Sequence, residues 1–161
     1  MKKTRANKCE QCKAGARVPF AFVVKRQLDG RAFSGEVPAT RCDNCGEELV
    51  SGPGLGLFDN ALTAQLARSG MVGPQGFRWL RGRAGLEAKQ LAVLLDVSPG
   101  TVSRWENGKK PLERRAVALV ATLALEALGE RADTRGLLGQ LASGRKPARR
   151  VRLDVPRPAG E

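Results

Sequence analysis

Residues 78–111 read RWLRGRAGLEAKQLAVLLDVSPGTVSRWENGKKP, and this stretch predicts two short helices joined by a tight turn. The first helix is expected over residues 87–95, where apolar side chains recur at helical spacing. The residues of this apolar face are Leu91, Ala92, Leu94 and Leu95. Asp96 and Val97 form the short break that follows.

The second helix is expected over residues 98–106. Ser98 is a natural N-cap, because its hydroxyl accepts a hydrogen bond from a free backbone N–H of the first turn. Pro99 suits the first helical position, where a backbone donor is not needed. Asn107 and Gly108 end the helix, because both tolerate the left-handed conformation beyond a helix terminus.

This pattern resembles the Xre/Cro-type helix-turn-helix over roughly residues 74–128. The resemblance rests on AGL at 84–86, QLA at 90–92, the turn residue Val97 and ENGKKP at 106–111. The family implies that the second helix enters the major groove of DNA and reads base edges with its N-terminal half. An ordinary helical hairpin with no DNA role is the alternative.

Val102 and Trp105 are three residues apart and are expected to face inward, which leaves Arg104 free to read a base. A guanidinium bonds guanine O6 and N7 together, which is worth about 1–3 kcal/mol of discrimination. Lys109 and Lys110, just past the helix, are expected to contact phosphates. The remaining predicted DNA-contacting residues are Ser98, Gly100, Thr101, Ser103, Lys89 and Gln90. Because Gly100 has no side chain to read a base, DNA shape is expected to carry part of the recognition.

The composition favours a binding protein. The 161 residues suit one domain or two small ones. A net charge of +12 favours a polyanionic partner, although solubility is the plain alternative. The chain has no His and no Tyr, which argues against an enzyme. No signal peptide is recognisable and no apolar run reaches the roughly 20 residues of a membrane span, so a cytoplasmic protein is expected.

All four cysteines lie in two CxxC pairs, Cys9 with Cys12 and Cys42 with Cys45. Two such pairs present four sulfurs in the tetrahedral arrangement that Zn²⁺ accepts, at about 2.3 Å per bond. We expect one structural Zn²⁺ per chain, because four protein ligands leave no open position for a substrate. Disulfides and a redox-active CxxC are the alternatives, and a reducing cytoplasm disfavours the first.

The residues between the two pairs predict a β-hairpin with strands over 18–25 and 32–41. Leu28-Asp29-Gly30-Arg31 is the turn signal that joins them. The picture is a zinc ribbon, in which the cysteine pairs hold the open end of the hairpin together.

This part resembles the YgiT-type zinc finger, through the early CxxC, the β-rich insert, CDNCGEE at 42–48 and a helix over 58–70. A YgiT-type finger followed by an Xre-type helix-turn-helix is the layout of MqsA-like antitoxins of bacterial type II toxin–antitoxin pairs. The family implies a zinc half that binds a toxin, and a helical half that dimerises and represses its own operon. A stand-alone phage- or plasmid-type transcription factor with a zinc ribbon is the alternative.

The expected fold class is therefore α+β, in three parts. Residues 1–70 form a zinc ribbon with a trailing helix, and 71–130 form an all-α, five-helix DNA-binding and dimerisation domain. Residues 131–161 form a short helix and a basic tail that is expected to be disordered from Arg145 onward. A loop over 50–56 and a hinge-like joint over 70–73 are also expected.

Residues 116–128 are the most apolar part of the chain. A helix that is apolar around most of its circumference needs more cover than one small domain gives. We therefore expect one face to pack on the helix-turn-helix and the other on a second copy, in a homodimer. A fully buried central helix in a monomer is the alternative.

Overall fold

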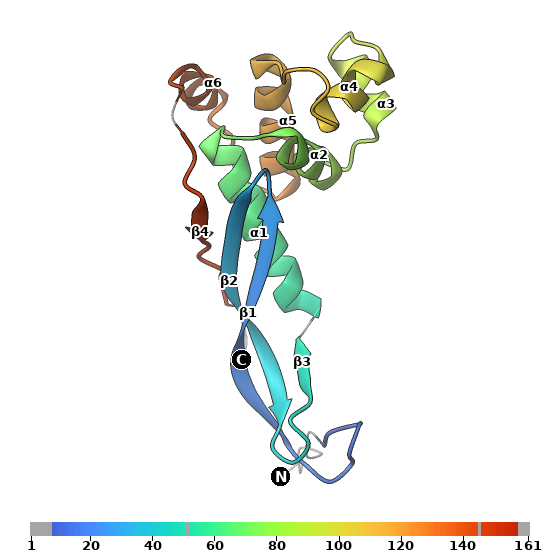
Figure 1. Cartoon of the computed structure of the whole chain (residues 1–161), viewed down its shortest axis with the longest axis vertical. Coiled ribbons are helices and arrows are strands. Elements are labelled where there is room, and N and C mark those ends of the chain that lie inside the picture. The colour runs from blue at the N-terminus through green and yellow to red at the C-terminus, as the bar shows by residue number, and fades with distance from the viewer. Residues whose placement is uncertain (1–7, 51, 145, 158–161) are drawn as a thin grey trace.

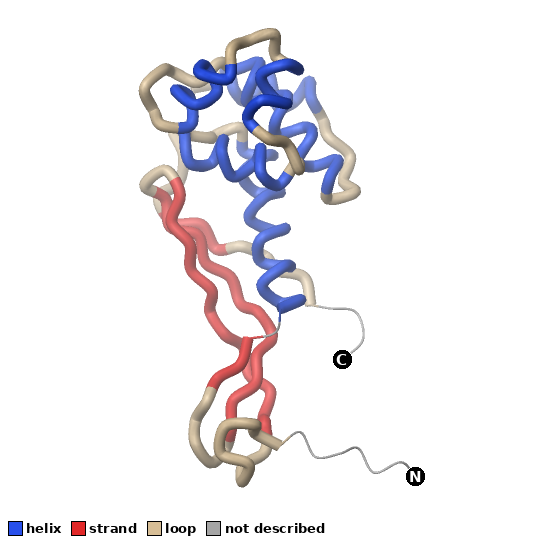
Figure 2. Tube along the Cα trace, turned by 90° about the vertical axis from the view of Figure 1, so that its right-hand side faces the viewer, coloured by secondary structure: helices blue, strands red, loops and turns tan. Residues whose placement is uncertain are grey.

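A long two-stranded hairpin separates the two ends of the molecule (Figure 1). The computed structural model describes residues 8–50, 52–144 and 146–157. The helices gather at the hairpin tip (Figures 1 and 2). The cysteines lie at its open end, where Arg17 pairs with Cys42. The predicted α+β class is confirmed. Among the described residues, no helix is both long enough and apolar enough to cross a bilayer.

The hairpin forms as predicted. β1 (Arg17–Leu28) pairs antiparallel with β2 (Arg31–Cys42) along their whole length. Asp29 and Gly30 join them with φ values of 52° and 70°. Two consecutive residues with positive φ make the two-residue turn whose twist matches that of paired strands, and Asp-Gly is a favoured sequence for it.

β2 is the centre of the sheet. β3 (Glu48–Val50) pairs antiparallel with β2 at Ala39 to Arg41. β4 (Arg150–Arg152) pairs in parallel with β2 at Ala32 to Ser34. The prediction of a disordered tail is therefore wrong for residues 146–157, whereas Arg145 and residues 158–161 lie outside the described residues.

Apolar side chains hold the tail in place. Val151, Leu153 and Val155 alternate with polar residues, and Leu153 is only 6% exposed. Gly35 of β2 makes room for them, because a Cβ there would lie 2.7 Å from Val155 and 3.1 Å from Phe58. This alternation has the period of a strand, and the basic composition of the tail hid it at the sequence level.

Helix α1 (Gly52–Ser69) runs beside the hairpin from its middle into the helical cluster (Figures 1 and 2). The prediction of a loop over residues 50–56 is wrong for Val50 and for residues 52–56, whereas Ser51 lies outside the described residues. Pro53 falls in the first turn, where a missing backbone donor costs nothing. The buried residues Phe58, Leu62 and Leu66 hold the helix against its neighbours and outweigh the low helix propensity of the three glycines.

The other predicted helices are present. They are α2 (Pro74–Arg83), α3 (Ala88–Leu94), α4 (Pro99–Glu106), α5 (Arg114–Ala127) and α6 (Thr134–Ala142). Phe77, Leu80, Val102 and Trp105 are fully buried between α2 and α4. Leu94 was expected on the buried face of α3 but is 57% exposed, because α3 ends there and turns its last residues outward.

α5 is the central helix of the cluster and packs against α1, α2 and α6. Its residues from Ala116 to Ala118, and Val120, Ala121, Ala124 and Leu125, are buried within one chain. The argument that α5 needs a second copy to cover it is therefore wrong, because α1 and α6 supply the missing cover. The homodimer itself stays a prediction, as does the domain boundary at residue 70.

The joint at residues 70–73 is fixed by Asp29, not free to hinge as predicted. The Asp29 carboxylate accepts backbone N–H bonds from Gly73, Gln75 and Gly76 at 2.8–2.9 Å. In return, the Asp29 backbone N–H donates to the Gln75 side chain at 2.8 Å. A residue at the hairpin tip thus caps the N-terminus of α2, which has no side-chain cap of its own at Gly73.

Arg31 makes a further contact with the joint at residues 70–73. Its side chain is buried and donates to the carbonyl of Met71 at 2.9 Å and to that of Ala148 at 3.1 Å. The guanidinium also lies over the Phe33 ring, 4.9 Å from its centre. One side chain therefore joins the hairpin, the joint and the C-terminal tail.

Replacing Asp29 by Ala is expected to lower the free energy of unfolding by about 1–2 kcal/mol, because three N–H groups of α2 lose their acceptor. Urea unfolding monitored by circular dichroism measures the change. Asp154→Ala is the matched control, since Asp154 is exposed and has no partner in the described chain. Equal stability of the two variants would contradict the capping role.

Candidate metal centre and nucleic-acid interface

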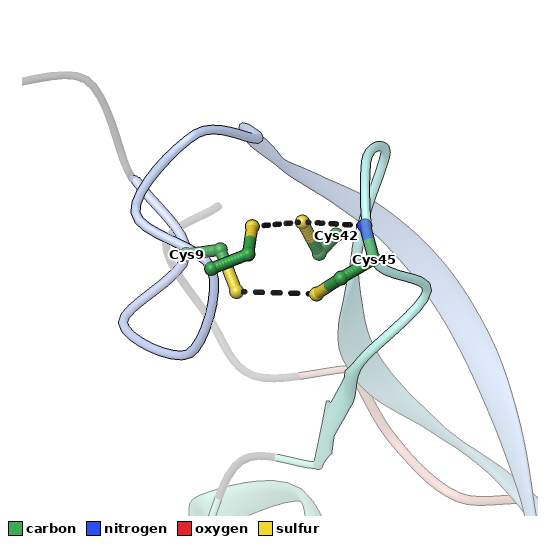
Figure 3. A group of neighbouring side chains, drawn as sticks. Cys9, Cys42 and Cys45 are labelled. Atoms are coloured by element: carbon green, nitrogen blue, oxygen red, sulfur yellow. Dashed lines mark hydrogen bonds between the residues drawn. The ribbon is translucent and has the colours of Figure 1, made fainter.

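The four predicted cysteines come together at the open end of the hairpin (Figure 3). Their sulfurs all lie within 4.8 Å of one another, with Cys9 to Cys45 at 3.7 Å and Cys12 to Cys42 at 3.6 Å. In a tetrahedral zinc–thiolate centre with bonds of about 2.3 Å, neighbouring sulfurs lie about 3.8 Å apart. The cluster therefore fits one tetrahedral metal ion if the longer sulfur–sulfur distances shorten by at most about 1 Å.

Backbone groups point at the sulfurs and favour thiolates. The N–H of Gly15 donates to Cys12 Sγ at 3.4 Å, and that of Cys45 donates to Cys42 Sγ at 3.5 Å. Hydrogen bonds from the backbone of Gly15 and Ala14 lower the pKa of Cys12 to about 6. The N–H groups of Lys13 and Gly46, which follow the second cysteine of each pair, bond the carbonyls of Cys9 and Cys42 instead.

Arg17 and Glu47 form an ion pair beside Cys9. Arg17 Nη2 lies 2.6 Å from a Glu47 carboxylate oxygen and 3.9 Å from Cys9 Sγ, and the Arg17 side chain is only 7% exposed. At Cys9, a backbone hydrogen bond from Cys12 lowers the pKa, but burial and the Glu47 carboxylate outweigh it and raise the pKa to about 12. Arg17 is therefore the buried cation that offsets negative charge at this centre.

At the other end of the molecule, α3 and α4 meet through a tight turn. The Glu87 N–H donates to the Gln90 side chain at 2.7 Å and closes a capping box at the start of α3. Asp96 takes a φ of 52° in the turn. Ser98 then caps α4 as predicted, accepting from the N–H of Thr101 at 3.2 Å.

A half-buried ion pair holds α4 onto α2. Arg81 Nε lies 2.5 Å from one oxygen of Glu106, and its Nη2 lies 3.3 Å from the other. Arg81 also donates to the carbonyl of Leu86 at 2.6 Å, just before α3. Beneath the pair, the rings of Phe77 and Trp105 meet edge to face at 5.9 Å. Trp105 is thus a core residue, as expected.

Residues 76–134 match the family model of a helix-turn-helix domain. The match covers α2 to α5 and supports the resemblance to the Xre type. It does not extend to the cysteine end, so the YgiT-type zinc finger and the MqsA-like layout stay predictions. A comparison with curated proteins found no match.

Within the helix-turn-helix domain, Arg104 of α4 is predicted to read a base. It is exposed on α4, and its guanidinium has no hydrogen bond or ion pair in the described parts of the chain. Lys109 and Lys89 are equally exposed and unpaired there. These three side chains are therefore available to a partner without loss of an internal contact.

The other predicted DNA-contacting residues have local roles. The hydroxyls of Ser98 and Thr101 lie 3.1 Å apart within the N-cap of α4. Gln90 closes the capping box of α3, and Ser103 accepts from the Asn107 side chain at 3.3 Å. Lys110 lies 3.7 Å from Glu113, and Gly100 is exposed near the start of α4. Contacts of these residues with DNA stay predictions.

The sequence did not predict three supporting contacts. These are the hydrogen bonds from the N-terminus of α2 to Asp29, the ion pair of Arg17 with Glu47, and the ion pair of Arg81 with Glu106. Each joins residues 25 or more positions apart. No spacing rule reaches that far along the chain. The position of Glu106 at the end of a helix is typical of a charge contact, but it does not identify Arg81 as the partner.

Proposed function

We propose that the protein is a zinc-containing, DNA-binding transcriptional repressor. The observation that carries this proposal is Arg104, exposed and without a partner among the described residues, on a capped second helix in a region that matches a helix-turn-helix domain. Four clustered cysteines without an open ligand position support a structural metal centre, so the chemistry offered is binding rather than turnover.

Replacing Arg104 by Ala is expected to weaken binding to the preferred sequence by about 1–3 kcal/mol and to relax the choice of base at one position. Lys109→Ala is the matched comparison, because it removes a phosphate contact and should weaken binding to all sequences alike. Selection from a random duplex library, followed by titration of the selected and scrambled sequences, measures both effects. If Arg104→Ala left sequence preference unchanged, its base-reading role would be wrong.

We further propose that the protein is the antitoxin of a type II pair, which binds its toxin through the cysteine end and represses its own operon. The support is the layout of the chain and two exposed apolar side chains at that end, Val18 (51%) and Leu49 (54%). These lie on β1 and β3, away from the helix-turn-helix domain (Figure 1). Exposed apolar groups on a strand are suited to a protein partner.

The test is co-expression of the full chain with its genomic neighbours on both sides. Co-purification of a small protein that is lost with Val18→Asp and kept with Leu138→Asp, an exposed change on α6, supports the antitoxin role. A zinc-loaded protein that retains no neighbour favours a stand-alone transcription factor. Size-exclusion chromatography of the purified protein, with the mass measured across its peak, reports whether the protein is the proposed homodimer.

A further inference from the structure

An open groove of about 1040 Å³ crosses the exposed face of α2. One wall is the loop that follows α4, with Asn107 and Gly108. The opposite wall is the hairpin tip, with Gln27 and Gly30. Arg78 lines the groove from α2 and Asp59 lines it from α1, so four separate parts of the chain contribute to it.

The free charge in this groove is positive. Three carboxylates line it, but each is already engaged: Asp29 with the α2 backbone, Asp59 with Arg26 at 3.5 Å, and Glu106 with Arg81. Arg78 is exposed and has neither a hydrogen bond nor an ion pair in residues 8–50, 52–144 and 146–157. Two of the carboxylates are cancelled by their ion pairs, and the Asp29 carboxylate keeps its negative charge. Arg78 and Arg83, which among the described residues donates only to the neutral Asn60 side chain, outweigh that charge, so an anion entering the groove would meet a net positive charge.

The groove also adjoins the predicted DNA-binding surface. Asn107 is the C-cap of α4, and Lys109 and Lys110 follow directly along the chain. When a recognition helix enters the major groove, the duplex backbones flank it and are contacted by the residues around its ends. A backbone that passes Lys109 would continue along the groove wall toward Arg78.

We propose that this groove binds a phosphodiester segment of the same duplex that α4 contacts, with Arg78 bonding a phosphate. The hairpin tip, which belongs to the cysteine-bearing part, then lies against the DNA backbone at Gly30. The proposal rests on the DNA-binding function proposed above and adds Arg78 of α2 and the hairpin tip to the predicted contacts of α3, α4 and the loop that follows.

Arg78→Ala tests the site, with Arg135→Ala as the matched control on α6, exposed and unpaired in the described chain. Phosphate contacts do not depend on sequence, so the probe is a fluorescein-labelled duplex of mixed sequence. Binding is followed by anisotropy over a series of KCl concentrations. We expect Arg78→Ala to weaken binding about three- to tenfold and to lower the slope of log K against log salt by about 0.9, the value for one phosphate. Arg78→Lys should keep the slope.

The outcomes separate this site from the proposed function. If Arg78→Ala has the slope and affinity of Arg135→Ala while Lys109→Ala lowers both, DNA binding stands and the groove is not part of it. If the wild-type protein binds no duplex at any salt concentration, both proposals are overturned. Circular dichroism of each variant shows whether a loss of binding reflects a loss of fold.

Discussion

We expect removal of the proposed zinc ion by a chelator to open the cysteine end of the protein while the helical end stays folded. Apart from Cys9, Ala39 and Cys42, the buried apolar residues lie in the half of the molecule that contains α1 to α6 and the tip half of the hairpin. The cysteine end therefore has little core to replace the metal–sulfur bonds. We expect amide hydrogen exchange over residues 8–20 and 39–50 to accelerate by about 100-fold or more, with the core of α5 unchanged.

Two comparisons make this prediction specific. Re-addition of Zn²⁺ to the chelated protein should restore protection, and Cys42→Ser should reproduce the chelated state at any zinc concentration. If chelation accelerated amide exchange equally along the whole chain, the metal would support the whole fold and not one end. Unchanged exchange over residues 8–20 would show that the cysteine end is stable without the metal.

The second large effect is expected from Glu106→Ala, which should lower the free energy of unfolding by about 3 kcal/mol. The side chains of Arg81 and Glu106 are only 15% and 9% exposed. Removing one partner of a buried pair leaves the other charge without compensation, which costs more than the pair itself contributes. Urea unfolding monitored by circular dichroism measures the loss.

A second ion pair with the same N–O distance provides a matched control. Arg41 and Glu48 also lie 2.5 Å apart, but their side chains are 54% and 36% exposed. Glu48→Ala should therefore cost at most about 1 kcal/mol, because water solvates the remaining charge. Replacing both Arg81 and Glu106 by Met should recover most of the stability that Glu106→Ala loses. Equal losses from Glu106→Ala and Glu48→Ala would contradict the role of burial.

Local signals predicted most of the candidate site. Ser98, Pro99 and Gly108 define the ends of α4 through the chemistry of individual residues, and that chemistry depends little on the rest of the fold. The two CxxC pairs were equally informative, because a tight turn must present both of its sulfurs to one side. Features of this kind need no knowledge of which segments meet in space.

Features that depend on distant contacts were missed or misjudged. The basic charge of the tail pointed to disorder, yet the alternation of Val151 and Leu153 made it a strand once β2 offered an open edge. The glycines before Phe58 pointed to a loop, yet packing on the sheet kept the segment helical. In both cases tertiary burial outweighed local composition, which a sequence without its fold cannot show.

The contacts of Asp29 and Arg31 join the hairpin to residues 70–76 and to the tail, so we expect the cysteine end and the helical end to keep a fixed relative orientation. A partner held at the cysteine end would keep a constant distance and direction from the operator, instead of moving on a tether. Two copies bound at adjacent half-sites would project their cysteine ends at a fixed angle, so the half-site spacing would decide whether their partners collide or share a surface. If single base pairs were inserted between the half-sites, the occupancy of the DNA by the partner-bound protein would then vary with the period of the DNA helix.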